Sequence, residues 1–69
     1  MTEKVENHIK QYRLEHGMTQ EELAKKVNVS RQSIISIEQG RYIPSLPLAL
    51  KFSRLFGCRT DDLFQLKEK

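Results

Sequence analysis

The sequence predicts an all-α fold built from five short helices. Helix-capping and helix-stop residues alternate along the 69-residue chain, and the apolar residues between them recur at three- and four-residue intervals. A chain of this length forms one domain, so we expect a compact unit that spans residues 1–69. Such a small domain buries only about 60% of its unfolded surface, and it therefore needs well-packed helices or a partner subunit.

The first two helices are expected over residues 8–16 and 20–27. Gly17 is placed to end the first helix, because glycine adopts the left-handed conformation of a helix stop without steric cost. Thr19 and Glu22 match the capping box that opens a helix, in which each side chain bonds a backbone N–H of the other residue. The boundary between the two helices is therefore marked on both sides.

A third helix is expected over residues 31–39, between the N-cap Ser30 and the stop residue Gly40. Asn28 lies in the turn before it and tolerates a left-handed conformation better than most residues do. Residues 19–40 thus predict a helix-turn-helix, in which one short helix is held across another. The apolar residues spaced to form the packed faces of this segment are Leu23, Val27, Val29, Ile34 and Ile37.

A fourth helix is expected between the N-cap Ser45 and the stop residue Gly57, and Thr60 is expected to cap a short fifth helix. Partial alternation of apolar and polar residues over 5–9 and 63–66 leaves an alternative for the chain ends. In that alternative the two termini pair as a small two-stranded sheet.

Positive charge is concentrated in the middle of the chain. Residues 1–30 carry five Lys or Arg and five Glu, whereas residues 31–59 carry five Lys or Arg against one Glu. The excess begins where the third helix begins, and it suits a polyanionic partner. A solvated basic face is the alternative explanation, and charge alone does not separate the two.

With Ile34 and Ile37 facing the core, the opposite face of the third helix carries side chains suited to reading DNA bases. Arginine can donate two hydrogen bonds to guanine, glutamine can pair with adenine, and isoleucine can contact a thymine methyl group. An ordinary polar surface is the alternative, but no Asp or Glu occurs between Arg31 and Ile37. The residues expected to read bases are Arg31, Gln32, Ser33, Ile35 and Ser36.

Residues around the ends of this helix-turn-helix suit the DNA phosphate backbone. Hydroxyl, amide and cationic side chains bind phosphates, which sets register and affinity without reading sequence. The residues expected in this role are Thr19, Gln20, Ser30, Gln39, Arg41 and Tyr42. Thr19 and Ser30 have the alternative role of helix caps, and Arg41 is the strongest of the six.

Arg13 and Glu38 are opposite charges set among apolar residues, on the inner sides of the first and third helices. We expect them to form a structural ion pair between these helices rather than to contact DNA. Removing one partner would leave a partly buried charge unpaired, which is costly in a small domain.

Four short motifs occur together and in order: Thr-Gln-Glu-Glu-Leu-Ala, Ser-Arg-Gln-Ser-Ile, Ile-Glu-Gln-Gly-Arg and Pro-Ser-Leu. Over residues 8–66 the chain resembles the Cro/CI-type (xenobiotic-response-element) family of bacterial, archaeal and phage repressors, in particular its short stand-alone members. The resemblance implies a lambda-repressor-like five-helix DNA-binding domain. It also implies a homodimer that binds a pseudopalindromic double-stranded DNA operator and represses transcription.

Carried over by position, the resemblance assigns base reading to Arg31, Gln32 and Ser36. It gives Gln20 a contact with the phosphate backbone and a supporting role toward the first base-reading residue, and it implies the internal salt bridge described above. Two positions depart from the family pattern: Asn28 replaces a common glycine, and Arg31 replaces a frequent glutamine. The operator preference of relatives therefore does not carry over.

A homodimer requires an apolar contact surface, and the C-terminal part of the chain supplies the candidates. These are Phe56, Leu63, Phe64 and Leu66, for which closure of the core is the alternative role. No second domain is evident that could bind a small-molecule effector.

Other functional classes have weak support. His8 and His16 lack the companions of a metal site, and Asp61 and Asp62 suit the first turn of a helix, so we expect no enzyme, metal or cofactor. Cys58 is alone and forms no intramolecular disulfide. Without a long apolar run or signal peptide, we expect a cytoplasmic, nucleoid-associated protein of prokaryotic or phage origin, with no membrane association.

The serious rival to direct DNA reading is an antitoxin or adaptor module that keeps the helix-turn-helix fold and acts mainly through a protein partner. Antitoxins usually add a segment that binds the toxin, and the predicted DNA-binding core leaves little room for one in 69 residues.

Overall fold

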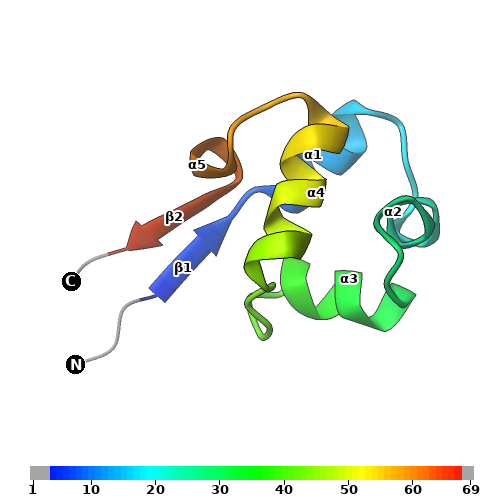
Figure 1. Ribbon diagram of the computed structural model, residues 1–69. Coiled ribbons are helices and arrows are strands. Elements are labelled where there is room, and N and C mark those ends of the chain that lie inside the picture. The colour runs from blue at the N-terminus through cyan, green and yellow to red at the C-terminus, as the bar shows by residue number, and fades with distance from the viewer. Residues whose placement is uncertain (1–3, 68–69) are drawn as a thin grey trace.

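The computed structural model describes residues 4–67. Residues 1–3 and 68–69, which belong to the predicted domain of residues 1–69, lie outside the described residues. Within the described part, five helices are flanked by one strand at each end (Figure 1). The elements in order are β1 (Lys4–Asn7), α1 (Ile9–Glu15), α2 (Gln20–Val27), α3 (Arg31–Glu38), α4 (Leu46–Phe56), α5 (Thr60–Leu63) and β2 (Phe64–Lys67).

The two chain ends lie side by side as an antiparallel sheet, in which Val5 faces Leu66 and Asn7 faces Phe64. The pairing continues past the strands, where His8 N donates to the carbonyl of the residue before β2 at 2.9 Å. Terminal pairing, the alternative left by the sequence, is therefore confirmed, and the all-α description needs this small sheet added. Because side chains alternate along a strand, one face of the sheet is largely apolar and the other is charged.

Three helices begin with the hydroxyl caps that the sequence predicts. The Thr19 hydroxyl accepts from the Glu22 backbone N–H at 3.1 Å, and the Glu22 carboxylate accepts from Thr19 N at 2.8 Å. The Ser30 hydroxyl accepts from Ser33 N at 3.1 Å. Ser45 caps α4 in the same way. These local hydrogen bonds fix the starts of α2, α3 and α4.

The expected cap of α5 is wrong by one residue. Arg59 holds the extended N-cap conformation, and Thr60 is already the first helical residue. The reason is the Asp62 carboxylate, which accepts from Arg59 N at 3.0 Å and so caps the helix from within its first turn.

Each of the first four helices ends on a residue with positive φ, after which the next backbone N–H reaches back into the helix. The residues with positive φ are Gly17, Asn28, Gly40 and Gly57. The returning bonds run from Met18 N to Arg13 O, Val29 N to Ala24 O, Arg41 N to Ser36 O and Cys58 N to Ser53 O, at 2.9–3.1 Å. This is the Schellman stop, and it makes the inter-helix turns short and well defined.

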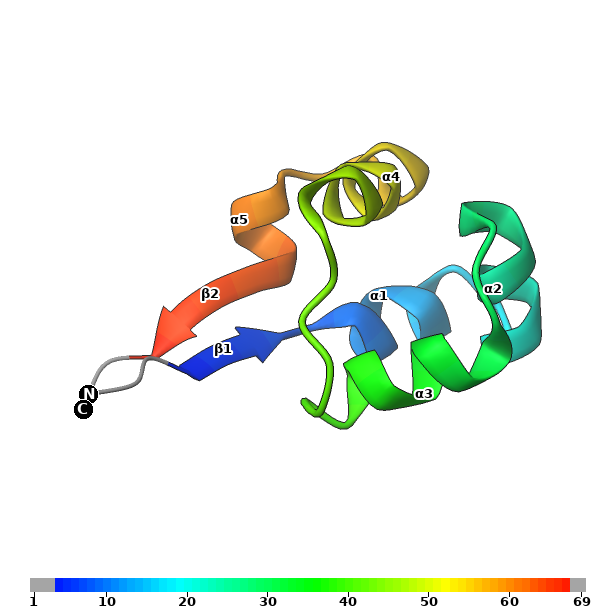
Figure 2. The same ribbon diagram turned by 60° about the horizontal axis from the view of Figure 1, so that its bottom comes forward.

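The core is formed by the inward faces of all five helices. Its buried apolar residues are Ile9, Leu23, Ala24, Val27, Ile34, Ile37, Leu48, Phe52, Phe56 and Leu63. Ile34 and Ile37 have no exposed surface, so the rotation of α3 about its own axis is fixed and its opposite face points to solvent. Figure 2 shows α3 along one side of the molecule and α4 on the other.

Asn28, with φ of 63°, is the only non-glycine residue with positive φ in the described part of the chain. Substituting Asn28→Ala should lower the free energy of unfolding by about 1 kcal/mol, because alanine lacks the side chain that makes this conformation tolerable for Asn. Asn28→Gly should preserve stability. Urea denaturation of the three proteins measures the difference, and an equal loss in both variants would show that the Asn side chain, not its backbone conformation, matters.

Burial raises the pKa of the half-buried Cys58 thiol above its ordinary value, and the nearby Asp62 carboxylate raises it further. A raised pKa means less thiolate at any given pH below it, and thiolate is the reactive form. Alkylation of Cys58 by iodoacetamide at mildly alkaline pH should therefore be several-fold slower in the folded protein than in denaturant. Equal rates would contradict a structural, unreactive Cys58.

Candidate nucleic-acid interface

The helix-turn-helix consists of α2, the turn at Asn28 and α3. Leu23, Ala24 and Val27 of α2 belong to the same buried cluster as the two core isoleucines of α3, and Val29 of the turn packs against it. The small Ala24 side chain is 3% exposed where the helices cross. This packing holds α3 against α2 and leaves the outer face of α3 uncovered.

The five residues predicted to read bases all lie on α3, but their exposure differs. Arg31 and Gln32 are exposed, whereas Ser33, Ile35 and Ser36 are half-buried. The Gln32 amide donates to the Ser36 hydroxyl at 3.4 Å, so these two side chains lie along the same face. Ile35 is less exposed than expected, so only part of its side chain is available for an apolar contact.

Apart from Gln20, which is described below, the residues predicted to contact phosphates divide into two groups. The Thr19 and Ser30 hydroxyls act as helix caps, so the alternative role of both residues is present in the structure. Gln39, Arg41 and Tyr42 are exposed at the end of α3 and in the loop that follows. Arg41 and Tyr42, in the loop, can therefore reach the phosphate backbone of a bound DNA without disturbing the fold.

Tyr42 lies closer to the base-reading face than the sequence suggested. Together with Ser30, Gln32, Ser33 and Ser36 it lines an open groove of about 240 Å³ along α3. Tyr42 is 46% exposed. A phenol in this position can meet either a base edge or a sugar-phosphate group, because its hydroxyl both donates and accepts.

Arg13 and Glu38 form an ion pair beneath this face. Arg13 Nε lies 2.7 Å from Glu38 Oε2, and the two side chains are 9% and 5% exposed. A second guanidinium nitrogen donates to Glu38 Oε1 at 3.3 Å, and the third donates to the Met18 carbonyl at 2.9 Å. Each guanidinium nitrogen thus has a partner, which a buried charge requires.

Gln20 joins the same cluster. Its amide donates to Glu38 Oε1 at 3.1 Å, so the hydrogen bond supports the ion pair and not Arg31, the first of the residues predicted to read bases. Gln20 is the first residue of α2, and Glu38 is the last of α3. The contact therefore ties the two ends of the helix-turn-helix together.

Asn7 holds the other side of α3, and the sequence did not reveal it. Its amide donates to the Ile37 carbonyl at 2.8 Å, and its side-chain oxygen accepts from Ile9 N at 3.2 Å. One side chain thus connects β1, the start of α1 and the C-terminal end of α3. The second contact is a local one typical of Asn before a helix, but the first joins residues 30 positions apart.

Two of the four expected dimer residues are not available to a partner. Phe56 is 6% exposed and Leu63 is fully buried, because both close the core of the protomer. Phe64 is half-buried, and Leu66 is 61% exposed. The surface available for pairing is therefore restricted to β2 and what lies beside it.

Within residues 4–67 no three His, Cys, Asp or Glu side chains gather as metal ligands would. No helix in that range has the length and apolar character needed to cross a bilayer.

Substituting Arg13→Met should lower the free energy of unfolding by about 3 kcal/mol or more, because Glu38 is left as an unpaired buried charge. Glu38→Leu should cost a similar amount, and the double variant should cost less than the sum of the two. Chemical denaturation of all three proteins completes the cycle. The matched control is Arg59→Met, which removes an exposed ion pair to Asp61 and should change stability little. Additive losses would contradict a coupled buried pair.

Comparison with known proteins agrees with this geometry. A helix-turn-helix family model matches residues 9–63. An uncharacterized HTH-type transcriptional regulator of Methanocaldococcus jannaschii is 53% identical over 60 residues, which are 87% of this chain and 91% of that protein. One from Bacillus subtilis is 42% identical over 65 residues, which are 94% of this chain and 98% of that protein.

Two solved structures share the fold. The transcriptional regulator VanUg superposes with a TM-score of 0.78 at 17% identity, covering all of this chain and 92% of that one. A hypothetical transcription factor from Neisseria gives a TM-score of 0.72 at 24% identity, where the match covers 78% of this chain and 61% of the other. On the family model and the sequence relatives, the chain belongs to the Cro/CI-type helix-turn-helix family of transcriptional regulators, which implies DNA binding.

Proposed function

We propose that the protein is a sequence-specific transcriptional repressor that inserts α3 into the major groove of a pseudopalindromic operator as a homodimer. The observation that carries the proposal is the outer face of α3, where Gln32 and Ser36 lie side by side and Arg31 is exposed at the start of the helix. No acidic side chain occurs between Arg31 and Ile37, so phosphates meet no repulsion there. In this role the protein acts in the cytoplasm at the nucleoid, by binding alone and without a small-molecule effector.

The chemistry of these side chains suits base edges in the major groove. The Arg31 guanidinium can bind guanine O6 and N7 together, and the Gln32 amide can bind adenine N6 and N7. In the absence of DNA, Gln32 is held by Ser36, and that bond is long enough to exchange for a base at small cost. Each bidentate contact discriminates against a wrong base by about 1–3 kcal/mol.

Phosphate contacts flank this face on both sides. Arg41 and Tyr42 follow the C-terminal end of α3, and the N-terminus of α2 presents backbone N–H groups at Gln20. Helix N-termini favour anions because of the helix dipole and these free donors. Such contacts at both ends orient α3 in the groove before any base is read.

We infer a homodimer because one recognition helix reads only a short stretch of DNA. Helix-turn-helix dimers place two recognition helices one turn of DNA apart, about 34 Å between half-sites. The protomer measures 35 × 23 × 20 Å, so two copies side by side can span that distance. Binding over a promoter would then block transcription by occupancy.

Selection of bound sequences from a random duplex pool tests the proposal. The wild-type protein should enrich a pseudopalindrome. Arg31→Ala and Gln32→Ala should each relax a different base pair by about 1–3 kcal/mol. No enriched motif, or one unchanged in both variants, would contradict direct reading by α3.

Arg41→Ala should instead weaken binding to all sequences alike and lower the salt dependence by about one phosphate contact. Arg54→Ala is the matched control, because it removes another exposed cation, from α4, on the other side of the molecule from α3 (Figure 2). Measuring the affinity of both variants for DNA over a range of salt concentrations shows whether only Arg41→Ala removes a phosphate contact. Equal losses of affinity in both variants would contradict a direct phosphate contact by Arg41, because they would show that only the overall positive charge of the protein matters.

A further inference from the structure

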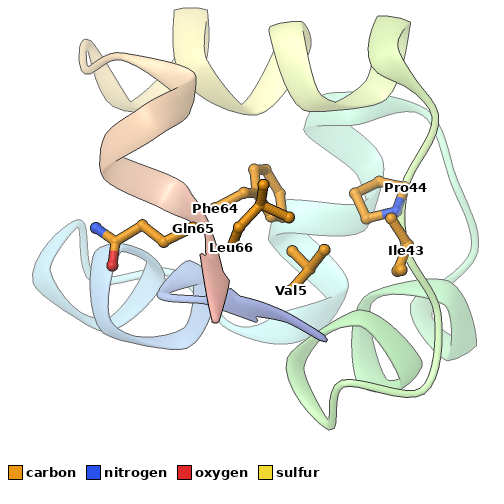
Figure 3. Close-up of a pocket in the computed structure, with 6 residues that line it drawn as sticks. All are labelled: Val5, Ile43, Pro44, Phe64, Gln65 and Leu66. Atoms are coloured by element: carbon orange, nitrogen blue, oxygen red, sulfur yellow. The ribbon is translucent and has the colours of Figure 1, made fainter. Parts of the chain in front are cut away.

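An apolar groove of about 230 Å³ opens between the sheet and the loop that follows α3 (Figure 3). Val5, Phe64 and Leu66 form one wall, and Ile43 and Pro44 form the other. A cavity of roughly 150 Å³ with aliphatic walls accepts a benzene ring. The groove therefore has room for at least one apolar side chain from a partner.

Exposed apolar residues gather around this groove. Ile43 and Leu66 on its two walls are 63% and 61% exposed, and Leu46, at the start of α4, is 69% exposed. Leu14 of α1 and Leu50 of α4 are 58% and 53% exposed, and neither lines this groove. Exposed apolar side chains on both walls of a groove are a candidate interaction site.

We infer that the groove is the seat of a second copy of the chain, an inference that rests on the homodimer in the proposed function and names its interface. A symmetric dimer needs one surface that is complementary to itself. This surface carries both parts of such a contact: the groove, and the exposed Leu66 side chain on its wall, which can enter the groove of a second copy. Leu66 of one copy fits between the strand and the loop of the other, and the reverse contact forms at the same time.

The outer edge of β2 supports the same partner. β2 pairs with β1 on one side, and the described chain supplies no strand to its other edge. The last three residues of β2 are exposed, whereas residues of β1 alternate between exposed and half-buried. An exposed edge binds readily to another strand, and the same strand of a second copy is antiparallel to it across a two-fold axis.

The place of the surface also fits a second copy. A standard interface covers about 800 Å² on each partner, about a sixth of the 5078 Å² surface of this protomer, so a dimer seated here also covers the exposed residues of β2 and the loop at Ile43. A small separate pocket beside the groove extends to Gly40 and Tyr42, after the C-terminal end of α3. Arg31 is at the opposite end of that helix, so a copy seated on the groove leaves the first turn of α3 uncovered.

Sedimentation velocity without DNA tests the inference, over a wide range of protein concentration. The wild-type chain should dimerise, and Leu66→Glu and Ile43→Glu, from the two walls, should each be monomeric. Leu14→Glu is the matched control, because it changes an equally exposed leucine away from the groove, and it should dimerise like wild type. Circular dichroism should show that all four proteins are folded, and two variants from separate walls protect the test if one of them unfolds.

DNA binding separates this inference from the proposed function. Leu66→Glu should bind a single half-site as wild type does but should lose about a hundredfold or more on the full operator, where linkage of two sites adds avidity. A wild-type chain that is monomeric alone and on the operator, or a groove variant that still dimerises, would overturn the interface. In that case base-dependent half-site binding would leave DNA reading intact. Dimerisation without any DNA binding would overturn the proposed function and leave the interface standing.

Discussion

The buried pair between Arg13 and Glu38 is the interaction on which the arrangement of the helices depends. It joins α1 to the end of α3, and it recruits the Met18 carbonyl from the turn before α2 and the Gln20 amide from its start. Burying two charges is expensive, and the attraction between them compensates only when every hydrogen-bonding group has a partner. Here the guanidinium and the carboxylate both have their partners. The pair therefore favours one arrangement of the helices and makes other arrangements unfavourable.

This constraint determines what α3 can present to a ligand. Its inner face is fixed by two fully buried isoleucines, its last residue by the ion pair, and its C-terminal carbonyl by Asn7. The backbone that carries the outer face is consequently held in one orientation. Preorganised side chains lose less conformational entropy on binding, which favours specific contacts over loose ones.

The sheet connects this frame to the edge of the molecule. Asn7 belongs to β1 and bonds to Ile37 of α3, while β1 pairs with β2, which borders the apolar groove. A copy seated in the groove would therefore touch the strand pair that anchors the recognition helix. The distance between two such helices in a dimer would be set by rigid elements rather than by a flexible linker.

The sequence predicts most of the helical frame because the signals are local. The box of Thr19 and Glu22 and the turn at Asn28 each depend on residues three or four positions apart, and both are found in the structure. Thr60 was misplaced by one residue because the Asp62 cap competes with it over the same short range. Contacts between residues far apart in the sequence are harder to predict. The terminal sheet is only an alternative on sequence grounds, and no sequence pattern indicates the hydrogen bond from Asn7 to Ile37.

The candidate site shows the same division. Helical periodicity is enough to predict that Gln32 and Ser36 share a face of α3, and the structure joins these two side chains by a hydrogen bond. The partner of Gln20 and the position of Tyr42 beside α3 depend on how loops and helices pack, which periodicity does not describe. The groove is likewise made by three segments far apart in the sequence, Val5, residues 43–44 and residues 64–66, so it emerges only in three dimensions.

The most direct test of α3 as the reading helix is a titration of the ¹⁵N-labelled protein with its selected operator, followed by amide chemical shifts. The largest changes should fall on the first turns of α3, on the start of α2 and on the loop at Arg41 and Tyr42. Amides of α5 and of the outer face of α4 should move little. Changes confined to α4 or to the sheet, with α3 unaffected, would contradict the assignment.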